Sequence, residues 1–459
     1  MSVLTIDHLH PLTALIARDG TTAGAWLHRV ADRHRALDFG AMACRREKVT
    51  RWTRDGVTPD RTALLAIASL HGIPEADVHR CGWPDFLHLA LDDDRPYLES
   101  PWTAEGTVTL LTEVGGPVDR RGVLIATSST LAAAVAQWST AEPALATTGR
   151  NRRVGHQSAD LFETRLDALR RLDDELGAHH VHDAALVELR LITGLLKNAS
   201  YTGETGCRLL SAAAEAARIA GWCAYDTGHH RAAERHFLTS LRAAASAGDT
   251  TRGAVTLAFW ANLRYSNGDP TGALHLIDGA LSHRRTITSP RALAMLHARA
   301  ARAHSTAGDH RAAWRRIDAA FAAYTHADTP EADLPSLYWI TAGELHQVAA
   351  STALALHTPK KALAHFDAAV THHDPYDPER ELRGTVIYQA RHTAAHIAIG
   401  DIDAALDTGH RILAAIDGID SPRSTAALHQ VRDHLTPHRH IPAVNDFLGQ
   451  SSRPPAPPQ

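Results

Sequence analysis

The stretch NGDPTGALHLIDGAL at 267–281, followed forty residues later by AGDHRAAWRRIDAAF at 307–321, decides the fold of this 459-residue chain. Five copies of the pattern align on a small or polar residue, an alanine five positions later, and apolar or small residues nine, twelve and thirteen positions later. The copies begin at Gly228, Gly268, Gly308, His357 and Gly400, so their spacings are 40, 40, 49 and 43 residues. A period of this size is typical of a stacked array of helix pairs.

The residues of each copy have a direct physical meaning. A glycine is the cheapest residue for a tight turn with positive φ, so a turn is predicted at each start. Asp269, Asp309 and Asp401 follow their glycines and suit the N-cap of a new helix. The later positions are spaced as i, i+4, i+7 and i+8, which places them on one buried face of that helix.

These copies resemble the tetratricopeptide repeat over roughly residues 205–420. The resemblance implies an α-solenoid in which the first helix of each pair lines a concave face. The period here exceeds the usual unit of ~34 residues, so longer helices or longer loops are expected. The helices predicted over 158–227 are then degenerate repeats that cap the array.

Composition agrees with an all-α protein and restricts its function. The net charge is −4 and the sequence pI about 6.8, so the whole molecule is not a general binder of polyanions. Cys44, Cys81, Cys207 and Cys223 form no CxxC pair, which predicts reduced thiols in a cytoplasmic protein. No apolar run reaches the ~18 residues of a membrane helix. The apolar run within 119–138 is predicted to be a linker or docking helix, not an export signal.

The amino-terminal region departs from the repeat and is locally basic. Helices are predicted over 22–35, 37–45, 47–54, 60–71 and 75–80. Residues 29–54 hold eight Arg or Lys against three acidic residues, a net charge of +5. Such a patch in an otherwise acidic chain is the electrostatic footprint of a nucleic-acid site, although a solvated basic face is the simpler alternative.

The order of residues favours the first interpretation. REKVTRWTRDGVTPDRTALLAIASLHGIP at 46–74 resembles the second half of the helix-turn-helix domain of lambda-repressor and Cro-type regulators, the xenobiotic-response-element family. The matching features are Val49, Thr50 and Arg51, then Trp52, and a polar turn with Pro59. Thr53 and Asp55 depart from the family pattern, and 37–45 must serve as the first helix of the motif.

The resemblance implies a recognition helix in the major groove of DNA. Arg45, Arg46 and Lys48 would then face base edges, because arginine can bind guanine through two hydrogen bonds. Thr50 and Arg51 would contact phosphate or an adjacent base, and Arg54 would contact phosphate.

The segments between and after these regions complete the domain organisation. We expect a helix-turn-helix domain at 20–92, a linker with a docking helix at 93–157, a tetratricopeptide-like array at 158–449, and a disordered proline-rich tail at 450–459. This arrangement resembles a group of actinobacterial-type transcriptional regulators.

Catalysis and metal binding have little support in the sequence. No GxSxG, P-loop or GxGxxG motif is present, so we expect neither an enzyme nor a cofactor. The 32 histidines cluster at 179–182 and 434–440, but no zinc-like spacing with a paired cysteine occurs, so no metal site is predicted.

The inner groove of the array is the predicted ligand site. Polar side chains there could pair with a peptide backbone, because an amide offers both a donor and an acceptor. The candidates are Asn198, Asn262, Arg264, Tyr265, Gln347 and Gln389. Trp222, Trp260, Trp314 and Trp339 are assigned to the core.

These observations predict a cytoplasmic regulator that binds a double-stranded DNA operator as a homodimer. Its array would sense a signalling peptide, a partner protein or a small molecule. The alternative is an interaction scaffold whose helix-turn-helix no longer binds DNA.

Overall fold

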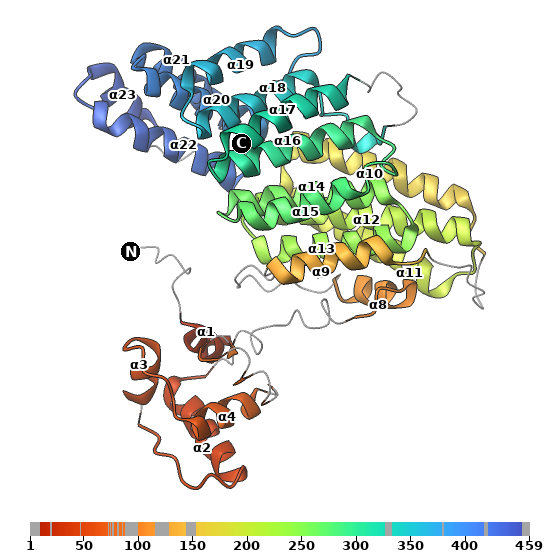
Figure 1. Cartoon of the computed structure of the whole chain (residues 1–459), viewed down its shortest axis with the longest axis vertical. Coiled ribbons are helices and arrows are strands. Elements are labelled where there is room, and N and C mark those ends of the chain that lie inside the picture. The colour runs from red at the N-terminus through yellow and green to blue at the C-terminus, as the bar shows by residue number, and fades with distance from the viewer. Residues whose placement is uncertain are drawn as a thin grey trace. The chain divides into compact units, whose positions relative to one another are not determined.

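The computed structural model of the chain forms two compact units, Met1–Glu99 and Ser100–Gln459 (Figure 1). It describes residues 10–18, 21–45, 47–71, 73, 75, 78–79, 82–84, 86–87, 100–114, 128–143, 153–325, 333–378, 381–416 and 421–451. The division between the units falls inside the segment 93–157, which the sequence marks as a linker.

Regular secondary structure in these ranges is helical, as the sequence predicts. The described residues contain no β-strand, and an isolated bridge joins Arg153 to Ser200. Among the helices that can be assessed, none combines the length and apolar character that a bilayer crossing needs.

The first unit packs four described helices around one apolar core. The helices are α1 (Pro11–Arg18), α2 (Ala23–Ala36), α3 (Glu47–Thr53) and α4 (Arg61–Leu70). Thr22 and Asp60 cap α2 and α4, accepting hydrogen bonds from the amides of Ala25 and Ala63. Fully buried Trp26 and Leu27 of α2 pack with Ile67 of α4.

One predicted helix of this unit is wrong. Residues 37–45 form a turn followed by chain without regular secondary structure, and ten residues separate the end of α2 from the start of α3. Asp38 and Gly40 both have positive φ, 59° and 82°, which ends the helical path directly after α2. A helix-turn-helix normally joins its two helices by three or four residues, so this connection departs from the family pattern.

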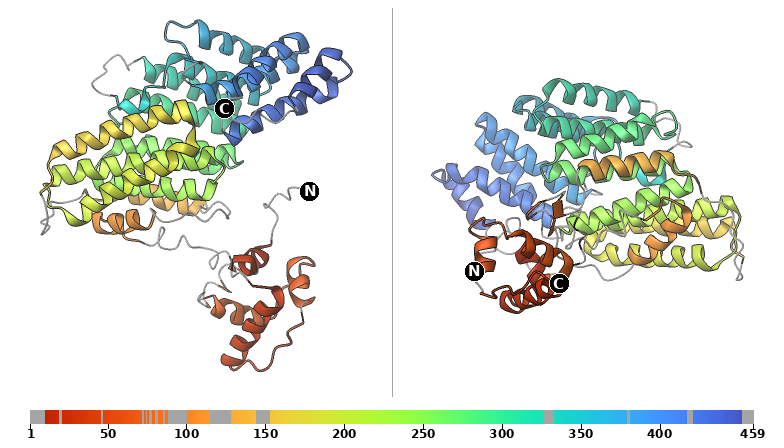
Figure 2. Two further views of the ribbon diagram at one scale, coloured as in Figure 1. Left: turned by 180° about the vertical axis from the view of Figure 1, so that it is seen from behind. Right: turned by 60° about the horizontal axis from the view of Figure 1, so that its bottom comes forward.

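The second unit consists of long helices that follow one another along the stack seen in Figures 1 and 2. They are α8 (Ala104–Val114), α9 (Ser128–Thr140), α10 (His156–Leu176), α11 (Ala178–Asn198), α12 (Gly203–Asp226), α13 (His230–Ala247), α14 (Thr250–Ser266), α15 (Pro270–Ser282), α16 (Pro290–Thr306), α17 (His310–Tyr324), α18 (Ala342–Ala355), α19 (Pro359–Thr371), α20 (Leu382–Ile399), α21 (Ile402–Ile416), α22 (Pro422–Leu435) and α23 (Pro442–Gln450), with short 3₁₀ turns at Pro335–Leu337 and Thr436–His438. Each of α12, α14, α16, α18 and α20 packs against the helix that follows it.

The five sequence copies fall on the turn and second helix of these five pairs. Gly228, Gly268, Gly308 and Gly400 have φ values of 76–83°, and His357 takes the same left-handed conformation at 56°. Asp269, Asp309 and Asp401 each accept a hydrogen bond from the amide three residues later, at 2.8, 2.9 and 3.1 Å. The turns and N-caps predicted from the sequence are therefore confirmed.

The predicted face of the second helices is buried at most positions, partly buried at Phe321 and Leu413, and exposed at one position. The alanine of every copy is fully buried: Ala233, Ala273, Ala313, Ala362 and Ala405. At the last position of the fourth copy, however, Val370 is 58% exposed. The predicted burial is wrong there.

Helices α8 and α9, which precede the array, pack on its surface. Helix α8 lies against α11 and α13, and α9 lies against α13 and α15. A glycine makes the second contact possible, because a Cβ at Gly279 of α15 would lie 2.3 Å from Cγ1 of Val135 on α9. Fully buried Arg242 donates hydrogen bonds to the carbonyl oxygens of Ser100 and Pro101 and so fixes the start of this unit.

The loop between α19 and α20 meets α18 at one glycine. A Cβ at Gly343 would lie 1.9 Å from the amide nitrogen of Tyr376, and the amide of Gly343 donates to the carbonyl of Asp374 at 3.0 Å. We expect Gly343→Ala to destabilise the second unit by roughly 1–3 kcal/mol or more, because the neighbouring atoms are backbone. Gly194→Ala, in open space on α11, is the matched control and should be neutral or stabilising by up to about 1 kcal/mol. The urea midpoints of the two variants measure these changes, and equal midpoints would contradict the close approach of the loop to Gly343.

Candidate functional site

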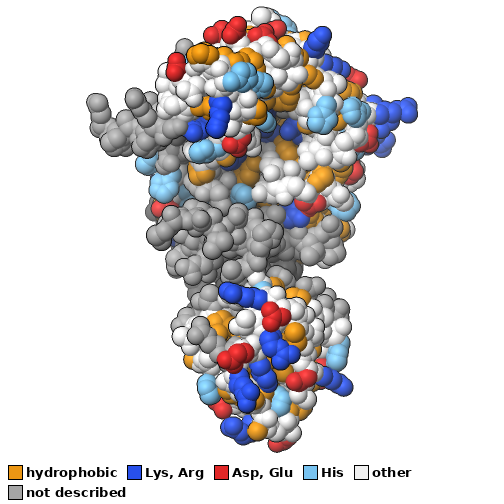
Figure 3. All heavy atoms as spheres, turned by 90° about the vertical axis from the view of Figure 1, so that its left-hand side faces the viewer, with side chains coloured by type: hydrophobic (Ala, Val, Ile, Leu, Met, Phe, Trp, Pro, Cys, Tyr) orange, Lys and Arg blue, Asp and Glu red, His pale blue; other side chains and the backbone are white. Residues whose placement is uncertain are grey.

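Helix α3 of the first unit presents a basic face. Val49 and Trp52 are buried in the core, so the residues between and beyond them turn outward. Arg45, Thr50, Arg51 and Arg54 are exposed and Lys48 is partly exposed, with its amine 6.0 Å from the centre of the Trp52 ring. Arg46 lies outside the described residues. Figure 3 shows basic side chains gathered on this unit, with acidic ones among them.

The second unit contains a cavity of about 150 Å³. The residues around it come from α10, α12, α14, α16, α18, α20 and α22, together with the 335–339 turn and the 376–384 segment. None comes from α13, α15, α17, α19 or α21. The first helix of each pair therefore lines the inner face, as the sequence predicts.

Arginine and aromatic side chains dominate the lining. Its arginines are Arg170, Arg218, Arg299, Arg302, Arg383, Arg391 and Arg423, and its aromatic residues are Trp222, Phe259, Tyr265, Tyr338, Trp339, Tyr376 and Tyr388. Aromatic residues make up only 5% of the whole chain, so their concentration here is specific to the site. Seven guanidinium groups meet five carboxylates in the lining, which leaves an excess of positive charge.

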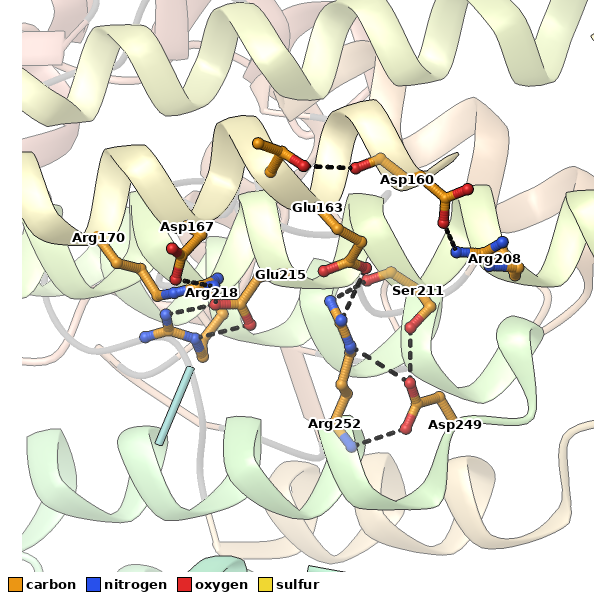
Figure 4. Close-up of polar contacts among 11 residues, drawn as sticks. Asp160, Glu163, Asp167, Arg170, Arg208, Ser211, Glu215, Arg218, Asp249 and Arg252 are labelled. Carbon is orange, nitrogen blue, oxygen red and sulfur yellow. Dashed lines mark hydrogen bonds and ion pairs between the residues drawn. The ribbon is translucent and has the colours of Figure 1, made fainter. Parts of the chain in front are cut away.

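At the α10–α12 end, the charges are paired. Arg170 of α10 and Arg218 of α12 both donate to the buried carboxylate of Glu215, at 2.9 and 2.7 Å (Figure 4). Burial alone would raise the pKa of Glu215, but the attraction of Arg218 and Arg170 outweighs it and holds this pKa well below its usual range. Glu215 is therefore charged, and it ties α10 to the stack.

The same network extends away from the cavity. Arg252 of α14 donates to Glu163 of α10 at 2.7 Å and also pairs with Asp249 (Figure 4). Arg208 of α12 pairs with Asp160. These contacts fix α10, α12 and α14 relative to one another, so this end of the cavity has a defined geometry.

A second paired group joins helices that are distant in the sequence. Arg383 of α20 forms ion pairs with Asp173 of α10 and, at 3.1 Å, with Asp226 of α12. Arg423 of α22 pairs with Asp226 at 3.0 Å. The two ends of the array therefore meet across the cavity through arginine–aspartate pairs.

Glu344 of α18 has a different environment. Its carboxylate accepts a hydrogen bond from the hydroxyl of Tyr388 at 2.7 Å, and its side chain is buried. Burial raises its pKa to about 7, although Arg299, Tyr388 and Arg391 oppose that rise. A carboxyl with this pKa can exchange a proton near neutrality.

The predicted ligand residues do not all meet at this cavity. Asn262 and Tyr265 line it. Arg264 points elsewhere and pairs with Glu234 and Asp269. Asn198 is exposed and donates to its own helix at Gly194. Gln347 and Gln389 lie outside the lining, and neither Oε1 accepts a hydrogen bond from the described residues.

The assignment of four tryptophans to the core is wrong for two of them. Trp260 is buried, but Trp222 and Trp339 line the cavity. The arginines of the lining were not among the predicted ligand residues, and Arg264, which was predicted, lies outside it. Their signal was present in the sequence, because Arg299 and Arg302 interrupt an alanine-rich first helix at i and i+3, which places both on one face.

Comparisons with known proteins leave the family open. No protein-family model matches the chain, and no curated protein has a significantly similar sequence. In the described ranges, no cluster of three or more His, Cys, Asp or Glu side chains has an arrangement that could hold a metal ion.

The raised pKa of Glu344 makes stability depend on pH. At acid pH this carboxyl is neutral in the folded and the unfolded chain, whereas above about pH 7 the folded chain must bury its charge. Stability is therefore lost as the pH rises from the ordinary glutamate pKa of 4.5 to about 7. We expect Glu344→Gln, which keeps an acceptor for Tyr388, to gain stability over wild type at about pH 8 and to gain much less at about pH 5.

Urea midpoints at the two pH values measure this difference. Glu175→Gln is the control, since Glu175 is exposed on α10 and its loss should change the midpoint little at either pH. An identical gain for Glu344→Gln at both pH values would contradict the assignment.

Proposed function

We propose that this protein is a sequence-specific DNA-binding transcriptional regulator. Its first unit, a helix-turn-helix variant, would contact an operator, and its tetratricopeptide-like α-solenoid would bind a ligand in the arginine-rich cavity. The observation that carries the proposal is the division of α3 into a buried face of Val49 and Trp52 and an outward face with Thr50, Arg51 and Arg54.

The charge distribution supports contact with DNA. Arg45, Arg51 and Arg54 are exposed, and none of them forms an ion pair with a described acidic residue. Free guanidinium groups on one helix and its flanks can contact phosphates and guanine edges. Residues 29–54 carry +5 in a chain of −4, so binding would be directed to this part of the molecule.

The array supplies the sensing element in this proposal. A ligand that binds one arrangement of the helices better than another shifts their population toward that arrangement. In a homodimer, such a shift would change the spacing of two DNA-binding units and hence the fit to two operator half-sites.

One observation favours a second function. Ten residues, and no helix among the described ones, connect α2 to α3. A first unit without a standard helix-turn-helix could instead dock a protein, which would make the chain an interaction scaffold. Ionic strength separates the two, because phosphate contacts weaken steeply with salt and an apolar protein interface does not.

The test is selection of bound sequences from random duplex DNA by the full-length protein. We expect wild type to enrich a palindromic site. Arg51→Ala/Arg54→Ala should weaken binding to that site by about fivefold or more, since a base contact of Arg51 contributes roughly 1–3 kcal/mol and Arg54 adds a phosphate contact. The slope of log affinity against log salt should also become shallower by up to about 2.

Arg311→Ala/Arg315→Ala is the matched control. Both residues are exposed on α17 in the array, and the change in charge is the same. This variant should bind like wild type. No enriched sequence, or equal affinity for both double variants, would overturn DNA binding and favour the scaffold.

A further inference from the structure

Two sets of arginines line the cavity, and they differ in their partners. Arg170, Arg218, Arg383 and Arg423 all pair with carboxylates. Arg299, Arg302 and Arg391 do not form an ion pair with any described acidic side chain. This second set, here called the open arginine cluster, lies on α16 and α20.

Neutral groups make the hydrogen bonds of the open arginine cluster. Arg299 donates to the hydroxyl of Tyr265 at 3.2 Å. Arg302 donates to the carbonyl oxygen of Ser351 at 2.6 Å, and Arg391 donates to the hydroxyl of the same serine at 2.9 Å. Two guanidinium groups from different helices therefore converge on Ser351 of α18.

Aromatic rings beside these arginines compensate their charge only weakly. The guanidinium carbons lie 5.8 Å from the Trp339 ring for Arg299, 6.0 Å from Tyr265 for Arg302 and 5.5 Å from Tyr388 for Arg391. These separations are near the outer limit of about 6 Å for a cation–π interaction. Glu344 is the nearby carboxylate, and it accepts a hydrogen bond from the hydroxyl of Tyr388 rather than from an arginine.

Packing like charges in a partly buried site is costly. Burial, together with the positive charge of Arg391, lowers the pKa of Arg302 to about 10. The group stays protonated at neutral pH, so the repulsion persists. A bound anion would relieve both the burial cost and the repulsion.

We propose that the open arginine cluster binds the oxyanion, a carboxylate or a phosphate, of a ligand with a single aromatic ring. The proposal rests on the sensing role of the array given above and specifies its ligand class. Arginine suits an oxyanion because its planar donors match two oxygens at once. The ring would lie against Tyr265, Trp339 and Tyr388.

The volume of the cavity limits how large the buried part of a ligand can be. A cavity of about 150 Å³ accommodates roughly one benzene ring, as engineered apolar cavities of that volume do. One ring with one oxyanion therefore fits the site, whereas several consecutive peptide residues do not. Such a group could belong to a free aromatic acid or phosphate ester, or to the carboxyl-terminal phenylalanine of a chain.

Calorimetric titration of the full-length protein tests this assignment. The probes are benzoate, phenyl phosphate and the neutral benzamide. The tripeptide Gly-Gly-Phe, as free acid and as amide, represents a chain terminus. We expect benzoate or phenyl phosphate to bind at least about tenfold more tightly than benzamide, because a charge-assisted pair contributes roughly 1.5–3 kcal/mol. Tight binding of the free-acid tripeptide, but not of its amide, would identify the chain terminus as the source of the oxyanion.

Variants connect the binding to the cluster. Arg302→Gln and Arg391→Gln should each remove the preference for the anionic probe over benzamide. Arg315→Gln, on the exposed side of α17, loses the same charge and should keep the preference. Glu344→Gln should tighten anion binding at about pH 8, because it removes the negative charge that faces Arg299 and Arg391. Thermal unfolding without ligand shows which variants fold. If one of the two arginine variants does not fold, the other still tests the cluster.

Two results would overturn the proposal: no binding of either small anion or of the free-acid tripeptide at millimolar concentration, or equal binding of benzoate and benzamide. Neither result involves DNA. Failure of the operator selection would leave the calorimetric result standing, so the two proposals can fail separately.

Discussion

The close approach of the two helices in each pair, at an alanine five residues after a left-handed turn, is the constraint on which the array depends. Ala233, Ala273 and Ala313 are fully buried at this point, as are their equivalents in the last two pairs. A larger residue there would separate the helices, because interiors are packed to near crystal density. Repetition of the same contact brings the first helices side by side, and their remaining faces then enclose one cavity.

The cavity is charged because the first helices direct arginine and carboxylate side chains into it. At one end, the buried carboxylate of Glu215 neutralises Arg170 and Arg218 and holds α10 on α12 (Figure 4). Toward α16 and α20, arginines outnumber carboxylates. The paired end holds the helices together, whereas the unpaired part carries the proposed oxyanion site.

The first unit is stabilised in a different way from the array. Its helices are short, and their stability comes from one core that includes Trp26 and Ile67. Burial of Val49 and Trp52 orients α3 and leaves its basic residues outward. Residues 37–45, which precede α3, are not helical, because Asp38 and Gly40 adopt positive φ values that a continuing helix cannot accommodate. DNA contact is thus proposed from the surface of α3 and not from the shape of the complete motif.

The sequence by itself determined the helical class, the repeat positions, the glycine turns and the aspartate caps, because local periodicity and turn chemistry are encoded in neighbouring residues. It also placed Asn262 and Tyr265 on the inner face. Tertiary structure alone decided that Arg299, Arg302 and Arg391 converge, that Trp222 and Trp339 leave the core, and that Arg383 meets Asp173. These residues are up to 210 positions apart, and their distances depend on how many helix pairs stack and at what angle. No local sequence pattern encodes these distances, because the small rotation between neighbouring helix pairs accumulates along the array.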